Sequence, residues 1–362
     1  MDVSRRLPRL LASGDADFLL VLRLEDIRWL TGFTGGTAQL LIRRSTHDAW
    51  LLVDGRYFER ATDEIAESNA SVHIERVVPD FSTDEMIARI VGASTVAVDP
   101  THVTAHFMTV LQSHCTVLAE KTQLDDLRRV KDESEIALIA RAANIADIAL
   151  STVVTDGLIG RSEKQIRNRL DHLMREGGAD DVAFETIVAT GPLGARPHHE
   201  PSDAIVEDGH GVVIDFGAMV QGYKSDMTRT IRVGAVSAEY QRMFELVIEA
   251  EAAGIASVKA GVVGAAVDAA ARAVFLREGV DHEYVHGTGH GIGLYIHEQP
   301  ILSPRCTAVL AVNEVVTVEP GLYRGGVGGV RIEDLVVVTG DSCRILTHTP
   351  KDLTCPRSPR TI

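Results

Sequence analysis

GVVIDFGAMVQGYKSDMTRTIRV, residues 211–233, is the stretch that decides the fold of the C-terminal part of this chain. It consists of two mostly apolar, strand-like runs, and each run contains one aspartate, Asp215 or Asp226. The aspartates are eleven positions apart, so a hairpin that turns at about Val220–Gln221 places them opposite each other. Opposite residues on one face of a sheet have Cβ atoms about 5 Å apart, which is close enough for both carboxylates to bind one metal ion.

A second hairpin repeats this arrangement further along the chain. Glu319 lies in VVTVEPGLY and Glu333 in GGVRIEDLVVV, and the midpoint between them is Gly326 in the glycine-rich turn RGGVGG. The two hairpins are therefore expected to deliver two carboxylate pairs to one face of a sheet. Buried carboxylates are rare in proteins unless they are paired or coordinate a metal ion.

His290 in HGTGHGIG supplies a fifth candidate ligand, and the flanking glycines allow the backbone to approach a crowded site. Four buried carboxylates carry four negative charges, which two divalent cations would cancel. We therefore predict a site for two divalent metal ions, with the ligands Asp215, Asp226, His290, Glu319 and Glu333. Oxygen-rich ligation with one imidazole favours Mn²⁺, with Co²⁺ and Zn²⁺ as alternatives. The zinc signature H-E-x-x-H is absent, because the chain reads HEQPI from residue 297.

The bulk properties of the sequence limit the possible classes of protein. A chain of 362 residues is long for one hydrophobic core and suggests two domains. The formal net charge of −15 argues against nucleic acid or an anionic membrane as a partner, since both attract basic surfaces. The four cysteines are scattered without C-x-x-C spacing, as in a reduced intracellular protein. No apolar run approaches the ~20 residues of a membrane span and no signal-peptide pattern is present, so we expect a cytoplasmic protein.

Residues 1–125 are predicted to form a small α/β domain. Short apolar runs that read as strands alternate with helical stretches; the runs are DFLLVL, QLLIRR, AWLLVD, TVAVDP and CTVLAE. None of them is followed by G-x-G-x-x-G, so dinucleotide binding is not indicated. The highly charged segment KTQLDDLRRVKDESE, residues 121–135, marks the boundary to a second domain of residues 126–362.

The second domain is predicted to belong to the α+β class. Asp132 is placed to cap a long helix, and Ser162 with Gln165 forms a capping-box pattern for the next one. Two further helices are expected over residues 237–258 and 264–278. Pairs of helices that alternate with long antiparallel strands suggest a curved antiparallel sheet with helices against one face.

Taken in order, these motifs resemble those of the creatinase/aminopeptidase P/prolidase metallopeptidases, which share the pita-bread fold. IRWLTGFTG and DGRYFERA are similar to the N-terminal creatinase-like domain, and LRRVKDESEIALIARAANIAD to the start of the catalytic domain. FETIVATG, PHHEP, VVIDFGA, SDMTRT, GTGHGIGLYIHEQP, TVEPGLY and GGVRIEDLV follow in the family's order. The resemblance implies that Asp215 and Glu333 contact both metal ions. It also implies that Asp226 chelates one ion, while His290 and Glu319 bind the other.

Further residues occupy positions that the family uses at its active site. By resemblance, His198 in PHHEP and His297 in YIHEQP are accessory histidines that hold the substrate or stabilise an oxyanion. The neighbouring His199 is the alternative to His198, because the alignment of the two histidines is open by one position. Arg331 matches an arginine near the active site, and His286 matches a histidine of the substrate pocket or of its surroundings.

The reaction that the resemblance implies is hydrolysis of a peptide bond that precedes proline, by an Xaa-Pro aminopeptidase or an Xaa-Pro dipeptidase. Metal-activated water is expected to attack the carbonyl carbon, and Glu319, as ligand and proton shuttle, to pass a proton to the departing nitrogen. The expected partner is a small peptide with proline at its second position, and the family predicts a homodimer. One loop departs from the family: PLGAR, residues 192–196, replaces the Asn-Ser pair of many relatives, so the resemblance does not fix the substrate preference.

Two other functions are compatible with the same fold. Creatinase-like proteins act on a non-peptide amide or amidine, and that branch lacks the metal ligands. A catalytically silent pita-bread protein that serves as a binding module usually has lost one or more ligands. All five ligands are present in this chain, which disfavours both alternatives. Methionine aminopeptidases generally lack the N-terminal domain.

Overall fold

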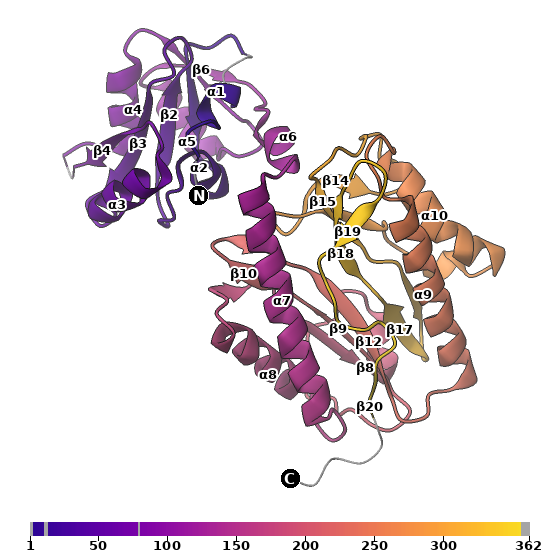
Figure 1. Ribbon diagram of the computed structural model, residues 1–362. Coiled ribbons are helices and arrows are strands. Elements are labelled where there is room, and N and C mark those ends of the chain that lie inside the picture. The colour runs from indigo at the N-terminus through magenta and orange to yellow at the C-terminus, as the bar shows by residue number, and fades with distance from the viewer. Residues whose placement is uncertain (1–2, 11–13, 79, 356–362) are drawn as a thin grey trace. The chain divides into compact units, whose positions relative to one another are not determined.

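The computed structural model describes residues 3–10, 14–78 and 80–355. The chain divides into two compact units, an N-terminal unit of residues 1–128 and a C-terminal unit of residues 129–362. The division falls within the charged segment of residues 121–135. Figure 1 shows both units and labels most of their helices and many of their strands.

The N-terminal unit is built on one mixed sheet of six strands in the order β4-β3-β2-β1-β5-β6. The strands are β1 (Phe18–Val21), β2 (Gln39–Arg43), β3 (Ala49–Asp54), β4 (His73–Val77), β5 (Thr95–Val98) and β6 (Thr116–Ala119). The helices are α1 (Leu7–Leu10), α2 (Leu24–Thr31), α3 (Phe58–Ser68), α4 (Thr83–Val91), α5 (Ala105–Gln112) and α6 (Leu124–Arg129). The predicted α/β class is confirmed, because β3–β4, β1–β5 and β5–β6 pair in parallel. The edge strand β4 was not predicted, since its polar sequence HIERV stays partly exposed and shows no apolar run.

The C-terminal unit contains four long helices, which form two consecutive pairs. They are α7 (Glu133–Asp156), α8 (Glu163–Glu176), α9 (Ala238–Ser257) and α10 (Gly264–Arg277), and the short 3-10 helices are η1 (Gly191–Ala195) and η2 (Asp281–Glu283). The predicted capping box at Ser162 is confirmed, because its side chain accepts from the amide of Gln165 while the Gln165 side chain accepts from the amide of Ser162. Asp132 and Glu135 form the same reciprocal cap at the start of α7. These caps satisfy amide groups that a helix start otherwise leaves without partners.

The strands of the C-terminal unit form four hydrogen-bonded groups: β20-β12-β9-β8, β14-β13-β15-β18-β19, β16-β17 and β11-β10-β7. They are β7 (Asp181–Val182), β8 (Ile187–Thr190), β9 (Gly211–Phe216), β10 (Ala218–Val220), β11 (Tyr223–Lys224), β12 (Met227–Val233), β13 (Gly289–Gly291), β14 (Glu298–Leu302), β15 (Val315–Val318), β16 (Gly321–Arg324), β17 (Gly328–Arg331), β18 (Asp334–Val338), β19 (Cys343–Ile345) and β20 (Thr354–Cys355). Their pairing is antiparallel apart from β12 with β20. Antiparallel strands combined with separate helix pairs confirm the predicted α+β class.

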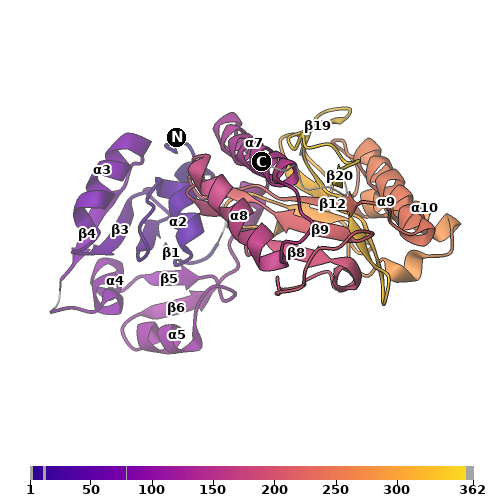
Figure 2. The same ribbon diagram turned by 90° about the horizontal axis from the view of Figure 1, so that it is seen from below.

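Side-chain alternation along the strands decides which residues face the helices. Ile214 and Phe216 of β9 are buried in a core that also contains apolar residues of α7 and α8, so Asp215 points to the opposite face of the sheet. Along β15, Val318 packs in a core with residues of α9 and α10, and Glu319 therefore faces the other way. Figure 2 shows α7 and α8 lying along β8 and β9, with α9 and α10 at the other end of the strands. The carboxylates that the sequence singled out thus lie on the face that the helices leave open.

Helix α7 requires one correction to the sequence analysis. Its 24 residues are long and apolar enough to cross a membrane by length and composition alone, although the sequence analysis found no run that approaches a membrane span. In the structure, 56% of its most apolar window is buried. Ala146, Leu150 and Val153 pack in the core with residues of β9 and β12, so the apolar composition of α7 belongs to a core helix.

Candidate active site

Asp215 and Asp226 come from one hairpin but do not lie directly opposite each other. Asp215 pairs with Thr228 of β12, and Asp226 lies two residues earlier, diagonally across from Asp215. The turn consists of Gln221 and Gly222, with φ angles of 46° and 74°, which is one position later than predicted. Because moving a turn by one position moves every cross-strand partner by two, the predicted opposite pairing is wrong. The two carboxylates still share one face, since a shift of two residues preserves the side of the sheet.

Glu319 and Glu333 face each other, as the sequence analysis predicted. The last pair between β15 and β18 is Val318–Asp334, and β16 and β17 continue with the same register. Glu319 and Glu333 are the next facing positions between these two pairs of strands. The hairpin is centred on Gly326, so the predicted turn is confirmed.

His290 lies on β13, where glycines permit an unusually close approach of the backbone. A Cβ atom on Gly289 would lie 2.0 Å from the carbonyl oxygen of Thr317, and one on Gly291 would lie 2.2 Å from that of Gln299. Any larger residue at either position would therefore displace a neighbouring strand. The predicted role of the glycines that flank His290 is confirmed.

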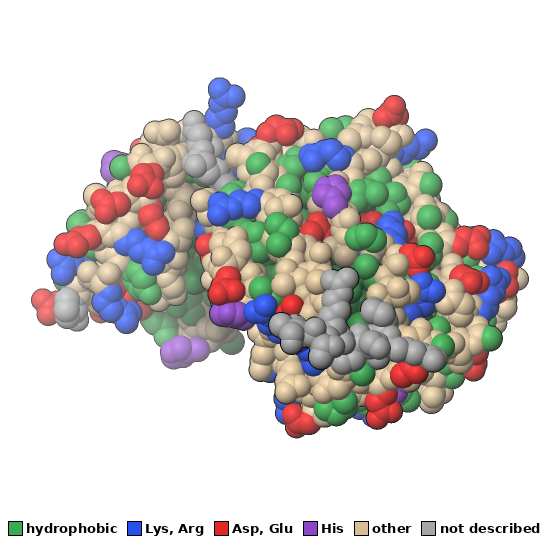
Figure 3. Space-filling model, turned by 60° about the horizontal axis from the view of Figure 1, so that its bottom comes forward, with side chains coloured by type: hydrophobic (Ala, Val, Ile, Leu, Met, Phe, Trp, Pro, Cys, Tyr) green, Lys and Arg blue, Asp and Glu red, His purple; other side chains and the backbone are tan. Residues whose placement is uncertain are grey.

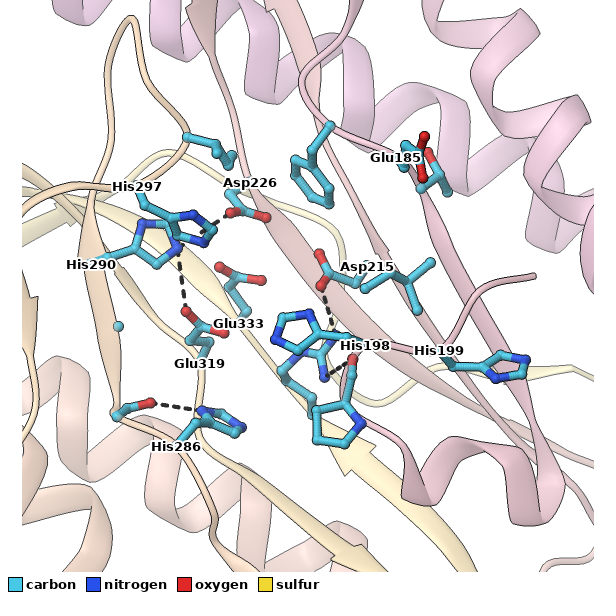
Figure 4. A pocket seen from close by; sticks show the side chains of 18 of the residues that line it. Glu185, His198, His199, Asp215, Asp226, His286, His290, His297, Glu319 and Glu333 are labelled. Carbon is cyan, nitrogen blue, oxygen red and sulfur yellow. Dashed lines mark hydrogen bonds and ion pairs between the residues drawn. The ribbon is translucent and has the colours of Figure 1, made fainter. Parts of the chain in front are cut away.

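The two ring nitrogens of His290 have different partners. Nδ1 lies 3.0 Å from the carbonyl oxygen of Gly291, which can only accept, so Nδ1 carries the hydrogen and Nε2 the lone pair. Nε2 lies 3.6 Å from Oδ2 of Asp226 and 3.4 Å from Oε1 of Glu319 (Figure 4). Burial lowers the pKa of His290 to about 4. A neutral imidazole whose other nitrogen donates to a carbonyl is the form in which histidine binds metal ions.

Several carboxylate oxygens of the cluster have no protein donor. Oδ1 of Asp215, Oδ1 of Asp226 and Oε1 of Glu333 are buried and accept no hydrogen bond from any residue within the described ranges. Ligand atoms of Asp226, His290 and Glu333 all lie within 4.8 Å of one another. Buried oxygens without donors cost free energy unless a cation or a proton lies beside them. The predicted ligand set therefore fits divalent cations, both in its chemistry and in its unsatisfied oxygens.

Burial and mutual repulsion keep protons on this cluster when no cation neutralises it. Burial raises the pKa of Glu319 to about 8, opposed by Arg331 and reinforced by Asp215. Burial, followed by repulsion from Glu333, raises the pKa of Asp226 well above its ordinary value. The pKa of Glu333 is raised in the same way, by burial and then by Glu319. Divalent cations would replace these protons, so metal binding is expected to release protons.

Arg331 is buried beside the cluster and holds three of its neighbours. Its Nη2 donates to Oδ2 of Asp215 at 2.7 Å, Nη1 donates to the hydroxyl of Tyr323 at 2.8 Å, and Nε donates to Oγ1 of Thr228 at 3.1 Å. The Thr228 hydroxyl in turn donates to Oε2 of Glu333 at 2.7 Å. Arg331 thus fixes one carboxylate directly and a second one through Thr228.

Tyr323 is a residue of the site that the sequence analysis missed. Its oxygen accepts from Arg331 and lies 2.8 Å from Nε2 of His286, whose Nδ1 lies 2.8 Å from the carbonyl oxygen of Gly287. Burial lowers the pKa of His286 to about 4, so the ring is neutral, Nδ1 donates to the carbonyl, and the tyrosine hydroxyl donates to Nε2. His286 therefore lines the cavity with both nitrogens engaged by the protein. The hairpin register contained the missing signal, because it places Tyr323 and Arg331 on one face as diagonal neighbours.

All the predicted site residues line one cavity of about 510 Å³. These residues are His198, Asp215, Asp226, His286, His290, His297, Glu319, Arg331 and Glu333. The ring centroids of His297 and His290 are 4.4 Å apart, so His297 stands at the edge of the carboxylate cluster. In Figure 4, His198 faces the carboxylates from the side opposite His297, whereas His199 points away from them. The cavity therefore combines an acidic, buried floor with two exposed histidines on its rim.

A cluster of carboxylates and one histidine, in which several buried oxygens lack donors within the described ranges, is a candidate metal site, and comparison with known proteins identifies its family. Residues 137–340 match the model of metallopeptidase family M24, and residues 4–133 match that of the creatinase/prolidase N-terminal domain. This chain belongs to the M24 metallopeptidase family. The resemblance seen in the sequence motifs is thereby confirmed, and so is the predicted combination of a creatinase-like domain with a pita-bread domain.

Relatives within the family match the chain from end to end. The uncharacterized peptidase YqhT of Bacillus subtilis is 35% identical over 93% of this chain and 95% of the relative. The structure of an Xaa-Pro dipeptidase from Bacillus anthracis superposes with a TM-score of 0.89 at 34% identity, covering 94% of this chain and 95% of the other. The X-Pro aminopeptidase from Thermotoga maritima MSB8 gives a TM-score of 0.85 at 33% identity, with 94% and 97% coverage.

Proposed function

We propose that this peptidase depends on two divalent metal ions and hydrolyses the peptide bond on the N-terminal side of proline, as an Xaa-Pro aminopeptidase or an Xaa-Pro dipeptidase. The observation that carries the proposal is the convergence of five buried or partly buried ligand residues in one cavity of a chain whose full-length relatives include both activities. The creatinase-like alternative is disfavoured, since the ligand residues are all present.

The proposed metal ligands are Asp215, Asp226, His290, Glu319 and Glu333. Divalent cations held there supply Lewis-acid activation of water and of the peptide carbonyl. The proposed metal is Mn²⁺, because carboxylate oxygens dominate the ligand set and only one imidazole joins them. Co²⁺ and Zn²⁺ are the alternatives.

The protein's own groups supply the remaining steps of the proposed reaction. Glu319, whose carboxyl is buried beside His290, would accept a proton at Oε1 and pass it to the departing nitrogen. His198 and His297, on the rim, are placed to donate to the carbonyl oxygen of the substrate as negative charge develops there. Arg331 orients Asp215 through the hydrogen bond from Nη2 to Oδ2.

The cavity also has an apolar wall that suits a proline-containing peptide. Besides the polar residues, it is lined by Phe184, Ile187, Pro197, Ile296 and Ile301. A proline imide has no N–H to offer, so its ring is recognised by shape and apolar contact.

On the face that Figure 3 shows, Lys and Arg side chains are interspersed with Asp and Glu side chains. Because the chain has a formal net charge of −15, we propose a small peptide and not a polyanion as its substrate.

A direct test uses the purified chain loaded with Mn²⁺. An Xaa-Pro dipeptide and an Xaa-Pro-Xaa tripeptide are incubated with it, together with the matching Xaa-Ala peptides and a sample treated with chelator. We expect cleavage of at least one proline peptide, little cleavage of the alanine controls, and loss of activity with chelator. The preferred length separates the dipeptidase from the aminopeptidase. Equal cleavage of the alanine peptides would refute proline specificity, and bound metal without any cleavage would favour the binding-module alternative.

The homodimer, which the family resemblance implies, and the cytoplasmic location remain predictions. Sedimentation of the purified chain at micromolar concentration tests the first, and a single species with the mass of one chain would contradict it. Fractionation of the producing cell tests the second.

A further inference from the structure

A buried carboxylate on α8 lies outside the ligand cluster and takes no part in the proposed reaction. Glu163, the first residue of α8, has no exposed surface. Within the described ranges its carboxylate meets no Lys or Arg side chain, and its hydrogen-bond partners are Thr190, His199 and Ser202. A buried carboxylate is costly unless its oxygens are fully hydrogen-bonded, so this arrangement calls for a reason.

The hydrogen bonds of Glu163 hold both ends of one loop. Oε1 accepts from the amide of Thr190 at 2.8 Å, at the point where the chain leaves β8. Oε2 accepts from the amide of Ser202 at 2.8 Å and from its hydroxyl at 2.6 Å. The backbone of α8 adds a further tie, since the amide of Lys164 donates to the carbonyl of Ser202 at 3.1 Å. Residues 190–202 therefore form a loop that is closed on Glu163, and this loop contains the unusual segment 192–196.

The third partner of Glu163 is His199, within the same loop. Nε2 of His199 lies 2.8 Å from Oε2 of Glu163, an oxygen that already accepts from two Ser202 groups, so Nε2 donates. His199 is buried, whereas the adjacent His198 is exposed to the cavity. Figure 4 shows the two rings pointing in different directions, with His198 toward the carboxylates. Holding the His199 ring in the protein thus directs the His198 ring toward the carboxylate cluster.

The other side of the loop rests on the strand that carries Arg331. Nη1 of Arg331 donates to the carbonyl of Pro197 at 3.4 Å, next to His198. A Cβ atom on Gly194 would lie 2.9 Å from the backbone nitrogen of Gly329, so the loop lies directly on β17. The loop is therefore held between α8 and β17, and its position relative to the carboxylates depends on both.

We propose that Glu163 and His199 are positioning residues, which fix the loop of residues 190–202 so that His198, and not His199, faces the substrate. This inference rests on the proposed function, in which His198 contacts the substrate. It also assigns a reason for the buried charge: an aspartate or glutamine at residue 163 would not reach or accept from all three partners at once.

The first experiment measures kcat and KM for the better Xaa-Pro peptide with Glu163→Gln, in the wild-type background and in the His198→Ala background. We expect kcat/KM to fall by about 10- to 100-fold in the wild-type background, because small displacements of a substrate-contacting group have effects of this size. In the His198→Ala background the same substitution should have an effect of less than about twofold, since the group that Glu163 positions is already absent. An equal loss in both backgrounds would overturn the proposal.

Two matched controls separate positioning from general damage. Glu176→Gln removes a carboxylate from the same helix, where Glu176 forms an exposed pair with His172 at 3.3 Å, and it should leave kcat/KM unchanged. His199→Gln keeps an N–H donor toward Glu163 and should retain most of the activity, whereas His199→Leu should lose as much as Glu163→Gln. These His199 variants also decide the question if Glu163→Gln does not fold. Equal activity of the two His199 variants would contradict the proposal.

A crystal structure of Glu163→Gln gives a readout that does not depend on the reaction. We expect the His198 ring to leave the position that faces the carboxylates, while the ligand residues stay in place. If the wild-type chain cleaves no Xaa-Pro peptide, the proposed function fails, but the crystal structure still tests the positioning role. A His198 ring in its wild-type position would overturn that role.

Discussion

Buried Arg331 pairs with the partly buried Asp215, and Nη2 of the arginine lies 2.7 Å from Oδ2 of the aspartate. The other oxygen of Asp215, Oδ1, has no donor among the described residues. Oδ2 of Asp215 therefore contacts the Arg331 guanidinium, and Oδ1 is left to bind one of the proposed metal ions. Arg331 also donates to Tyr323 and Thr228, so its planar group determines the orientation of several neighbours at once.

Replacement of Arg331 by lysine should therefore be far from conservative. Lysine keeps the charge but cannot reach Asp215, Tyr323 and Thr228 together, because it lacks the rigid fork of the guanidinium. We expect Arg331→Lys to lower kcat/KM by about 100-fold. The control is Arg324→Lys on β16, which removes a guanidinium that pairs with Glu283 and Glu239 and does not line the cavity; it should change kcat/KM by less than about twofold. Steady-state kinetics on an Xaa-Pro peptide provide the measurement, and wild-type activity of Arg331→Lys would show that the fork is dispensable.

Substitution of His290 and of its neighbour His297 tests which of the two histidines binds metal. Only His290 places a lone-pair nitrogen near Asp226 and Glu319, although the two ring centroids are 4.4 Å apart. After Mn²⁺ loading and dialysis, His290→Asn should retain about one divalent ion per chain where the wild type retains about two. His297→Asn should keep the full metal content and lose turnover. Elemental analysis is the measurement, and equal metal content in both variants would remove His290 from the ligand set.

The pKa of Glu319 predicts how the stability of the chelated protein varies with pH. Because burial raises this pKa to about 8, the folded state keeps a proton that the unfolded state has lost above its ordinary carboxyl pKa. The contribution of Glu319 to stability is therefore present in full below about pH 4, and it decreases as the pH rises toward 8. We expect the chelated protein to lose stability over this range and Glu319→Gln to lose less. Thermal unfolding with chelator between pH 5 and 8 measures the difference, and a pH dependence identical in both proteins would contradict the raised pKa.

The contrast between the two hairpins shows which parts of the site were predictable from sequence. The hairpin of Glu319 and Glu333 is symmetric about Gly326. Its glycine-rich segment allowed the position of the turn to be predicted correctly. In the hairpin of Asp215 and Asp226, the non-glycine residue Gln221 takes a positive φ of 46° at the first turn position. Sequence patterns do not specify which residues form this turn. The predicted turn was one position too early, so the predicted partner of Asp215 was two residues away from the observed one.

The direction of side chains in loops was less predictable than the strands. Periodicity and capping residues located the helices and the sheet face, since these are local properties. The choice between His198 and His199 depends on Glu163, which is 36 residues before His199 in the sequence. The contact of Tyr323 with Arg331 follows from the hairpin register, but its contact with His286, 37 residues away, does not. Such contacts form only when distant segments pack together, so a single sequence contains no direct signal for them.

A buried ion pair beside the cavity gives a prediction about stability. Nζ of Lys131 lies 2.9 Å from Oε2 of Glu298, with side-chain exposures of 2% and 4%, and Glu298 follows His297 in the chain. Lys131→Met would leave the Glu298 carboxylate buried beside an apolar group, which should lower the free energy of unfolding by about 3–5 kcal/mol. Lys164→Met is the matched control, because Lys164 pairs with Asp203 at exposures of 46% and 84%, and the expected change is less than about 1 kcal/mol.

The double variant Lys131→Met/Glu298→Gln shows whether loss of the Lys131 charge beside Glu298 is the cause. If it is, removing the carboxylate as well should recover a large part of the stability, since a neutral amide of similar size is cheaper to bury than a carboxylate that has lost its cation. Urea unfolding of the wild type, the two single lysine variants and the double variant measures the four free energies. A double variant that is no more stable than Lys131→Met would mean that lost packing around the lysine side chain, and not charge, determines the effect.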